Sequence, residues 1–274
     1  MLDQRDAILR LLRDDDEFTV RLVKDQLSSK GRELIPELKE LLAIDDECVS
    51  RHVKEVIGQI DSREAAAELS ALCPHMDDDA DLERPNWLVA RVFMPGIDIK
   101  PFRRELDIWA MRLTTWLRDA RTPSERLGWT TKFIGEELGF RGNADDYYSP
   151  SNSLLPAVIT NRTGIPITLT LIYMMIGRRA GMEIEGVNFP GHFLARHGDL
   201  LFDPFERGRI LHDEECAEIL ERQSLELRDE HLEKATSVVM FRRILTNLLY
   251  VFQNQDDKPK AAMLADWIRD LGRS

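Results

Sequence analysis

Residues 164–181 decide the fold, because they form an apolar helix that only a protein interior can accommodate. The segment reads Gly164-Ile-Pro-Ile-Thr-Leu-Thr-Leu-Ile-Tyr-Met-Met-Ile-Gly-Arg-Arg-Ala-Gly181. Pro166 is acceptable in the first turn of a helix, and Ala180-Gly181 marks its end. Apolar side chains lie almost all round the intervening helix, so a surface position would leave many of them in water. The sequence therefore predicts a buried central helix over 165–180.

Three short strands are predicted directly after this helix. The segments 183–189, 192–196 and 200–202 are apolar-rich and are separated by the turn pairs Pro190-Gly191 and Gly198-Asp199. Strands joined by such short turns pair in the antiparallel sense. A helix followed by an antiparallel meander predicts an α+β fold with a sheet of three to four strands.

Helical segments flank this predicted core. The segments with helical spacing of apolar residues are 106–117, 129–138, 211–233, 236–254 and 258–271, of which the last two form a closing hairpin of tetratricopeptide-like type. Between them, residues 139–153 are dense in Gly, Asn, Asp and Pro, which predicts a long ordered loop. Loops of that kind often carry function.

The N-terminal residues 2–73 show helical periodicity throughout and a weak internal repeat. Residues Asp16-Glu17, Arg21 and Val23-Lys24 recur thirty residues later as Asp46-Glu47, Arg51 and Val53-Lys54. Acidic residues ahead of an amphipathic helix suit its positive end, so both copies are expected to start a helix. A repeat of this size indicates stacked hairpins of the HEAT type, although two copies also fit a chance similarity between helix starts.

Residues 74–86 combine two prolines with an acidic run and show no periodicity, which is typical of a linker with solvated charges. The sequence therefore predicts four parts: a HEAT-like helical segment at 1–73, the linker, a core domain at 87–235 and a helical hairpin at 236–274.

Composition excludes several classes of protein. The 274 residues include 37 basic and 49 acidic ones, giving a net charge of −12, and 43% are hydrophobic. Nucleic-acid binding and adhesion to anionic lipid are not expected, since both need clustered Lys and Arg. No stretch approaches the ~20 apolar residues that span a bilayer. Three scattered cysteines indicate neither a disulfide framework nor a metal motif, so a cytoplasmic protein is expected.

Five motifs in order resemble the SirB-type transglutaminase-like family of bacteria. They are Gly139-Phe-Arg-Gly-Asn143, Tyr147-Tyr-Ser-Pro-Ser-Asn-Ser153, Arg162-Thr-Gly-Ile-Pro-Ile-Thr168, Phe189-Pro-Gly-His-Phe193 and Phe202-Asp-Pro-Phe205. The resemblance implies a papain-related core in which a Cys at a helix N-terminus, a His and an Asp form the catalytic set. His192 and Asp203 match the second and third positions, and Pro166 stands where the family pattern places the Cys. Because fold does not fix function, the resemblance implies the architecture more firmly than an activity.

The chemistry of such a site needs a nucleophile, an imidazole to take its proton and a carboxylate to orient the ring. Neighbouring antiparallel strands are expected to bring His192 and Asp203 within hydrogen-bond reach. Proline offers no nucleophile. Cys216 lies in an acidic run that would raise its pKa, and Cys48 and Cys73 fit small buried apolar residues. The hydroxyls of Thr168 and Thr170 are alternatives, but helical threonines usually bond back to their own helix.

Two other interpretations of the histidines remain. His192, His197, Asp203 and His212 are close in sequence and include the residue types of an iron or zinc site. An odd separation of His192 and His197 on one strand would point them to opposite faces, so no metal is expected. Alternatively, His192 and Asp203 form a buried pair that only stabilises the sheet.

The leading hypothesis is a non-catalytic transglutaminase-like protein that binds a protein or peptide partner through the former catalytic cleft, without a cofactor, nucleic acid or membrane. Asn143, Tyr147, Asn152 and Thr168 are the predicted binding residues, in the loop and at the start of the central helix. The alternative is a hydrolase or acyl-transfer enzyme that uses His192 and Asp203 with water or a hydroxyl. An open imidazole favours chemistry, whereas a ring sealed by the neighbouring phenylalanines favours a scaffold.

Overall fold

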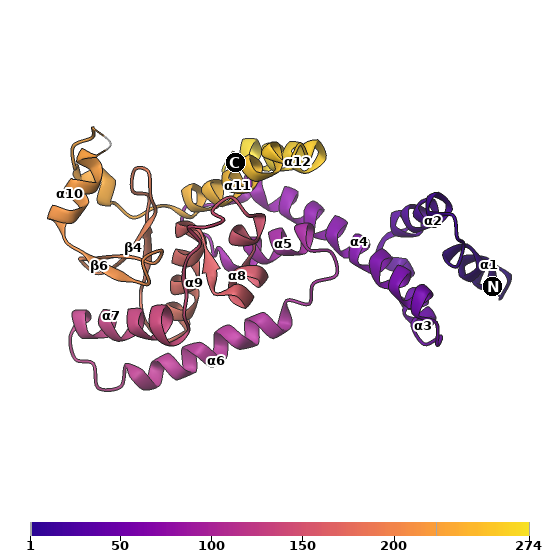
Figure 1. Cartoon of the computed structure of the whole chain (residues 1–274), viewed down its shortest axis with the longest axis horizontal. Helices are drawn as coiled ribbons and strands as arrows, with labels where there is room; N and C mark the ends of the chain where they lie inside the picture. Colours follow the sequence, from indigo (N-terminus) through magenta and orange to yellow (C-terminus); the bar gives the residue numbers. More distant parts are fainter. Residues whose placement is uncertain (1, 223, 274) are drawn as a thin grey trace. The chain divides into compact units, whose positions relative to one another are not determined.

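A computed structural model describes residues 2–222 and 224–273 and shows an α+β protein (Figure 1). The chain forms two compact units, which are Met1–Ser70 with Leu88–Asp98, and Ala71–Trp87 with Ile99–Ser274. None of the helices in the described residues is long and apolar enough to cross a membrane.

The first unit is helical. It contains α1 (Leu2–Leu12), α2 (Glu17–Ser29), a 3₁₀ turn (Gly31–Leu34), α3 (Ile35–Leu41), most of α4 (Glu47–Leu72) and the end of α5 (Glu83–Phe93). The two predicted helix starts are confirmed. The Asp16 carboxylate accepts the N–H groups of Phe18 and Thr19, and the Asp46 carboxylate accepts that of Val49. Each aspartate thus satisfies backbone donors that the helix itself leaves unpaired.

The second unit contains the predicted core. Its elements are a 3₁₀ turn (Cys73–His75), the start of α5, α6 (Lys100–Trp116), α7 (Pro123–Thr131), a π-helical turn (Lys132–Glu137), β1 (Arg141–Gly142), a 3₁₀ turn (Pro150–Ser153), α8 (Leu155–Asn161), β2 (Thr163–Gly164), α9 (Pro166–Arg179), β3 (Glu185–Val187), β4 (Leu194–His197), β5 (Leu200–Asp203), β6 (Arg209–Leu211), α10 (Asp213–Glu221), a 3₁₀ turn (Asp229–Leu232), α11 (Ser237–Asn254) and α12 (Lys258–Asp270).

The buried central helix is confirmed as α9. Every residue from Pro166 to Gly177 is buried except Met174. Helices α6 and α11 and the sheet all contact it, and Figure 1 shows it in the interior of this unit. A helix that is apolar on every side requires such enclosure.

The antiparallel meander has four strands in the order β3-β4-β5-β6. Ala195 pairs with Gly186 on one side and with Phe202 on the other, and Phe202 pairs with Ile210. A separate two-stranded ladder joins β1 and β2 in the parallel sense, which ties the start of the 139–153 loop to the residues just before α9. That loop therefore includes a short strand and ends in a 3₁₀ turn.

Two predicted helices differ from the structure. Helix 211–233 is wrong: Leu211 belongs to β6, and α10 ends at Glu221, close to Ser224, whose φ of 61° is left-handed and incompatible with a continuing helix. The predicted stripe at 129–138 changes from α-helix to a π-helical turn at Lys132. The closing hairpin lies close to its predicted bounds, as α11 and α12.

The domain boundaries at 73/74, 86/87 and 235/236 stay predictions, but the charges of the predicted linker are not all solvated. Helix α5 begins inside it at Glu83. Arg178 binds the Asp81 carboxylate at 3.1 Å, and Arg179 binds Glu83 at 2.8 Å. Both arginines come from the last turn of α9, where cations also favour the helix dipole. The acidic run thus anchors the C-terminal end of the central helix.

Glu83 is the most enclosed member of this cluster. Burial tends to raise the pKa of its carboxyl, but hydrogen bonds from Arg179 and from the Trp87 indole outweigh burial and hold the pKa below its ordinary value. Arg179 also binds the exposed Asp107 carboxylate at 2.8 Å. The ionised form of Glu83 is therefore the one that the folded protein stabilises.

Candidate functional site

His192 and Asp203 form the predicted pair. The imidazole Nε2–H donates to Oδ2 of Asp203 at 2.9 Å, which confirms that they lie within hydrogen-bond reach. One detail of the prediction is wrong: His192 lies in the turn before β4 rather than in a strand, held by its own N–H bonding to the carbonyl of Phe189. Asp203 is the last residue of β5. The Asp203 side chain is 8% exposed and that of His192 is 26% exposed, so the ring is not sealed.

The turn after Asp203 fixes the carboxylate. Oδ1 of Asp203 accepts the N–H of Phe205 at 2.9 Å, and the Asp203 carbonyl accepts the N–H of Gly208 at 2.8 Å. Arg207 and Gly208 both have positive φ, at 57° and 81°. Both oxygens of the carboxylate therefore have partners, one in the ring of His192 and one in the backbone of the turn.

Two glycines allow this turn to approach its neighbours. A Cβ on Gly135, in the π-helical turn, would collide with the carbonyl oxygen of Arg207, and a Cβ on Gly142, in β1, would collide with the ring of Phe205. The N–H of Gly142 donates to the carbonyl of Phe205 at 2.8 Å. Single-turn π-helices occur frequently at functional sites, and here the π-helical turn supports the loop that carries Asp203.

The four predicted binding residues form one network centred on Asn152. Asn143 donates to Oδ1 of Asn152 at 2.9 Å, and the Asn152 amide donates to the carbonyls of Asp146 and Tyr147. The hydroxyl of Thr168 donates to the carbonyl of Asn152 at 2.6 Å. The amide side chains therefore bind the loop to itself, whereas the backbone oxygen of Asn152 makes the contact with Thr168 of the central helix.

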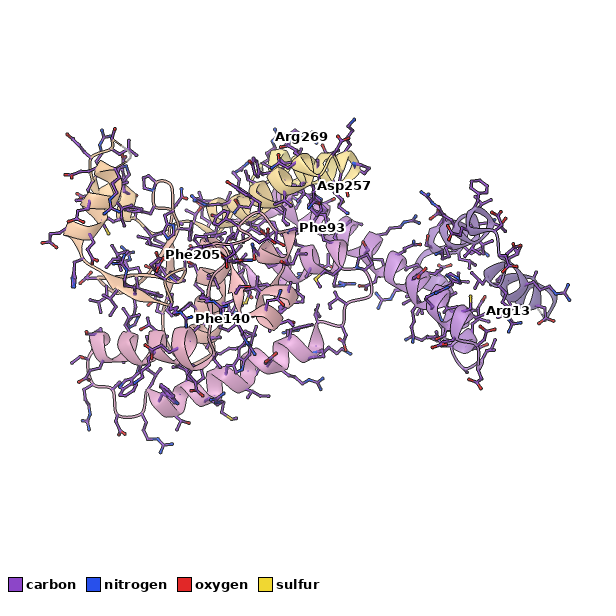
Figure 2. All side chains as sticks on the ribbon, viewed as in Figure 1. Arg13, Phe93, Phe140, Phe205, Asp257 and Arg269 are labelled. Carbon is purple, nitrogen blue, oxygen red and sulfur yellow. The ribbon has the colours of Figure 1, made fainter. Side chains whose placement is uncertain are left out.

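Phe205 links the network to the pair. Its ring lies 6.1 Å from that of Tyr147 and 6.0 Å from that of His192 between centroids. Figure 2 labels Phe205. Tyr147 also contacts Tyr148, which contacts Tyr250 of α11. The loop 139–153 and α11 thus present aromatic rings beside the pair, and Tyr148 and Tyr250 were not predicted as site residues.

The candidate nucleophiles lie in unsuitable surroundings. Pro166 is the first residue of α9, and the Thr168 hydroxyl is already engaged. Cys73 is buried, and burial, with the Asp270 charge adding to it, raises the pKa of its thiol to about 12. Cys216 packs in an apolar cluster under the sheet. The exposed Cys48 belongs to the other unit.

The histidines do not form a ligand cluster. Nδ1 of His197 bonds to the carbonyl of Glu183 at 2.7 Å. In the described part of the chain, no group of three or more His, Cys, Asp or Glu side chains converges as a metal site would require. His192 and His197 do not share a strand as predicted, since His192 precedes β4.

A buried helix packed on an antiparallel sheet, with a His–Asp pair at the strand ends, defines a transglutaminase-like core. The chain belongs to the transglutaminase-like superfamily, whose family profile matches residues 100–246. The predicted membership of a transglutaminase-like family is confirmed.

Several relatives share much of the chain. A UPF0162 protein of Xylella fastidiosa strain Temecula1 is 34% identical over 206 residues, covering 71% of this chain and 73% of the relative. A UPF0162 protein of Pseudomonas aeruginosa is 30% identical over 218 residues, 78% of each. F-box only protein 21 of Mus musculus is 40% identical over 93 residues, covering 30% of this chain and 15% of that protein. No solved structure matches the chain.

Proposed function

We propose that this protein is a non-catalytic member of its superfamily that binds a protein or peptide at the surface around His192 and Asp203. The observation that carries the proposal is the lack of a nucleophile. Among the described residues, the side chain of His192 hydrogen-bonds only to Asp203 and touches one ring, that of Phe205. An imidazole without a thiol or hydroxyl partner cannot generate the nucleophile of an acyl-transfer site.

The surroundings of the pair support recognition. Tyr148 is 60% exposed and Tyr250 is 47% exposed, although both rings make aromatic contacts. Exposed tyrosines are enriched at protein interfaces, where the ring supplies contact area and the hydroxyl bonds to water or partner. The hydrogen-bonded loop beneath them is already ordered, which lowers the entropic cost of binding.

One observation favours the alternative, a hydrolase. Asp203 occupies Nε2 of His192, so in the neutral ring Nδ1 carries the lone pair. The ring is partly exposed, and Nδ1 has no hydrogen-bond partner within the described residues. A water molecule at Nδ1 is the nucleophile that this alternative requires.

A paired experiment tests both functions. Peptides selected from a random library on the wild-type protein are tested for binding to Tyr148→Ser and to Met111→Ser, a control at another large side chain that is 66% exposed on α6. We expect Tyr148→Ser to weaken binding about tenfold, as for an interface hot spot, and Met111→Ser to leave it unchanged. Equal binding by both variants would refute the proposed surface.

Hydrolysis of p-nitrophenyl acetate and of the selected peptides is then compared between wild type and His192→Gln. We expect the same rates. Faster hydrolysis by the wild type, with both proteins folded by circular dichroism, would establish the hydrolase instead.

A further inference from the structure

Arg243 of α11 is a partly buried cation beside the candidate site. Its Nη1 donates to the side-chain oxygen of Asn188 at 2.7 Å, and its guanidinium lies 5.5 Å from the centre of the Phe193 ring, next to His192 in the chain. Burial raises the pKa of the Tyr147 phenol, and the charge of the nearby Arg243 acts in the opposite direction. Arg243 therefore lies near Tyr147 of the loop 139–153 and near Phe193, which follows His192 in the chain.

Among the described residues, no carboxylate forms an ion pair with the Arg243 guanidinium. Within the residues that the structure describes, Arg243 has no ion pair, although the chain carries an excess of twelve acidic residues. Three other partly buried arginines are paired with carboxylates: Arg91 with Asp61, Arg179 with Glu83, and Arg196 with Glu185. Buried charges are normally compensated in this way, because an isolated charge away from water is unfavourable.

Burial without a carboxylate partner among the described residues disfavours the charged form of Arg243. Burial lowers the pKa of the Arg243 guanidinium below its ordinary value, and only the phenol of Tyr147 acts in the opposite direction. A guanidinium has five N–H donors, and Asn188 accepts one of them. The remaining donors suit an anion arriving from outside.

The neighbouring Arg242, in the same helix, differs because its guanidinium has backbone hydrogen-bond acceptors. Its Nη1 and Nη2 donate to the carbonyls of Ile268 and Leu271 at the end of α12, at 2.8 and 3.1 Å. Those bonds satisfy helix-terminal oxygens, so Arg242 has a structural role in the closing hairpin. Arg243 has no such backbone acceptor among the described residues.

The aromatic neighbours indicate which other group of a ligand would bind next to the anion. Three of the four tyrosines in the chain, Tyr147, Tyr148 and Tyr250, lie in one contact series, of which Tyr147 interacts with Arg243. Arg243 and Tyr250 are seven residues apart and so lie on one face of α11. A cation next to exposed rings fits a peptide that presents a carboxylate and an apolar side chain.

We propose that Arg243 binds a carboxylate of the peptide ligand, while the three tyrosines contact a second side chain of that ligand. This inference rests on the proposed function, since it names the chemistry recognised at the same surface. The carboxylate is either the C-terminus of the peptide or the side chain of an Asp or Glu, because both offer the two coplanar oxygens that a guanidinium binds.

The test uses three probes: acetyl-Phe-Gly-Gly with a free C-terminus, its C-terminal amide, and acetyl-Phe-Gly-Asp amide. Binding to the full chain is followed by the NMR signal of the Arg243 Nε–H, assigned with Arg243→Gln, and by calorimetry. We expect the free acid to bind about tenfold more tightly than the amide, the loss for one charge-assisted contact. If the Asp probe binds as tightly as the free acid, Arg243 recognises side-chain carboxylates. If the Asp probe binds more weakly, Arg243 recognises the C-terminal carboxylate.

Arg243→Gln should abolish the preference for acid over amide without lowering the melting temperature. The matched control is Arg242→Gln, which should lower the melting temperature and keep the preference. A preference that survives Arg243→Gln, or equal binding of acid and amide to the wild type, would overturn the inference and leave peptide binding itself intact. No binding of any probe to the wild type up to its solubility limit would overturn the inference, while the library selection would still test the proposed function separately.

Discussion

The N-terminal end of α9 is anchored by neutral hydrogen bonds, whereas its C-terminal end is anchored by ion pairs. At the first end, Thr168 donates to the carbonyl of Asn152, whose side chain binds the loop. At the other end, Arg178 and Arg179 bind Asp81 and Glu83. The candidate site adjoins the neutral end. The loop beside the site is therefore held by groups that do not titrate, while the charged end fixes the acidic segment.

The largest effect is expected at the charged end. Glu83→Gln should lower the free energy of unfolding by about 3 kcal/mol, because it leaves the partly buried Arg179 without its enclosed partner. Asp107→Asn is the matched control, since it removes the other carboxylate of Arg179, which is 65% exposed, and should cost less than about 1 kcal/mol. Urea denaturation measures both. Equal losses would show that burial does not distinguish the two pairs.

At the neutral end, Asn152→Ala should lower the free energy of unfolding by about 2 kcal/mol, because it leaves the carbonyls of Asp146 and Tyr147 without their donor. Asn254→Ala, at an exposed position at the end of α11, should stay within about 0.5 kcal/mol of wild type. Thermal denaturation of the three proteins gives the comparison. A neutral Asn152→Ala would mean that the loop is not held by this amide.

A smaller and more discriminating effect comes from two threonines of α9. Both are fully buried, but Thr168 donates to Asn152, whereas the hydroxyl of Thr170 has no partner among the described residues. Thr168→Val should cost about 1 kcal/mol, and Thr170→Val should be neutral or stabilising, since it removes an unsatisfied polar group. Opposite signs in urea denaturation would confirm the hydrogen-bond assignment, and equal losses would contradict it.

The smallest effect is the pH dependence that separates the two ends. The folded protein holds the pKa of Glu83 below its ordinary value of 4.5, so the unfolded chain binds the proton more readily. The associated stability is present above pH 4.5 and is lost as pH falls through the folded-state pKa. Wild type should therefore lose more stability than Glu83→Gln on acidification, and Thr168→Val should follow the wild-type slope. Parallel curves for wild type and Glu83→Gln would contradict the assignment.

The sequence predicted the regions whose determinants are local. Helix α9 follows from an apolar run bounded by Pro166 and Gly181, and the His192–Asp203 contact follows from strands joined by short turns. The length of helix 211–233 was wrong because a strand and a left-handed residue interrupt it. The partners of Asp81 and Glu83 lie almost a hundred residues away, and no local pattern reveals them.

Arg243 was missed for a related reason. A single arginine in an apolar helix is common, and its significance comes from the carboxylate that it lacks in three dimensions. In the sequence, Arg242 and Arg243 are adjacent and identical. Nothing there distinguishes Arg242, which bonds to the closing hairpin, from Arg243, which lies beside the candidate site. The π-helical turn at Lys132–Glu137 was not predicted either, and the close approach of the Arg207 carbonyl to Gly135 within it joins residues far apart in the sequence.

The seven-residue separation of Arg243 and Tyr250 sets a length. A helix rises 1.5 Å per residue, so their backbones are about 10 Å apart along α11. An extended peptide advances about 3.3 Å per residue, and about three residues are needed to reach from the guanidinium to the ring of Tyr250. The proposed site therefore sets a minimum ligand length: peptides shorter than a tripeptide would contact either Arg243 or Tyr250, and longer ones would contact both. Since both residues lie on the single helix α11, this minimum length is set by that helix and not by the loop 139–153.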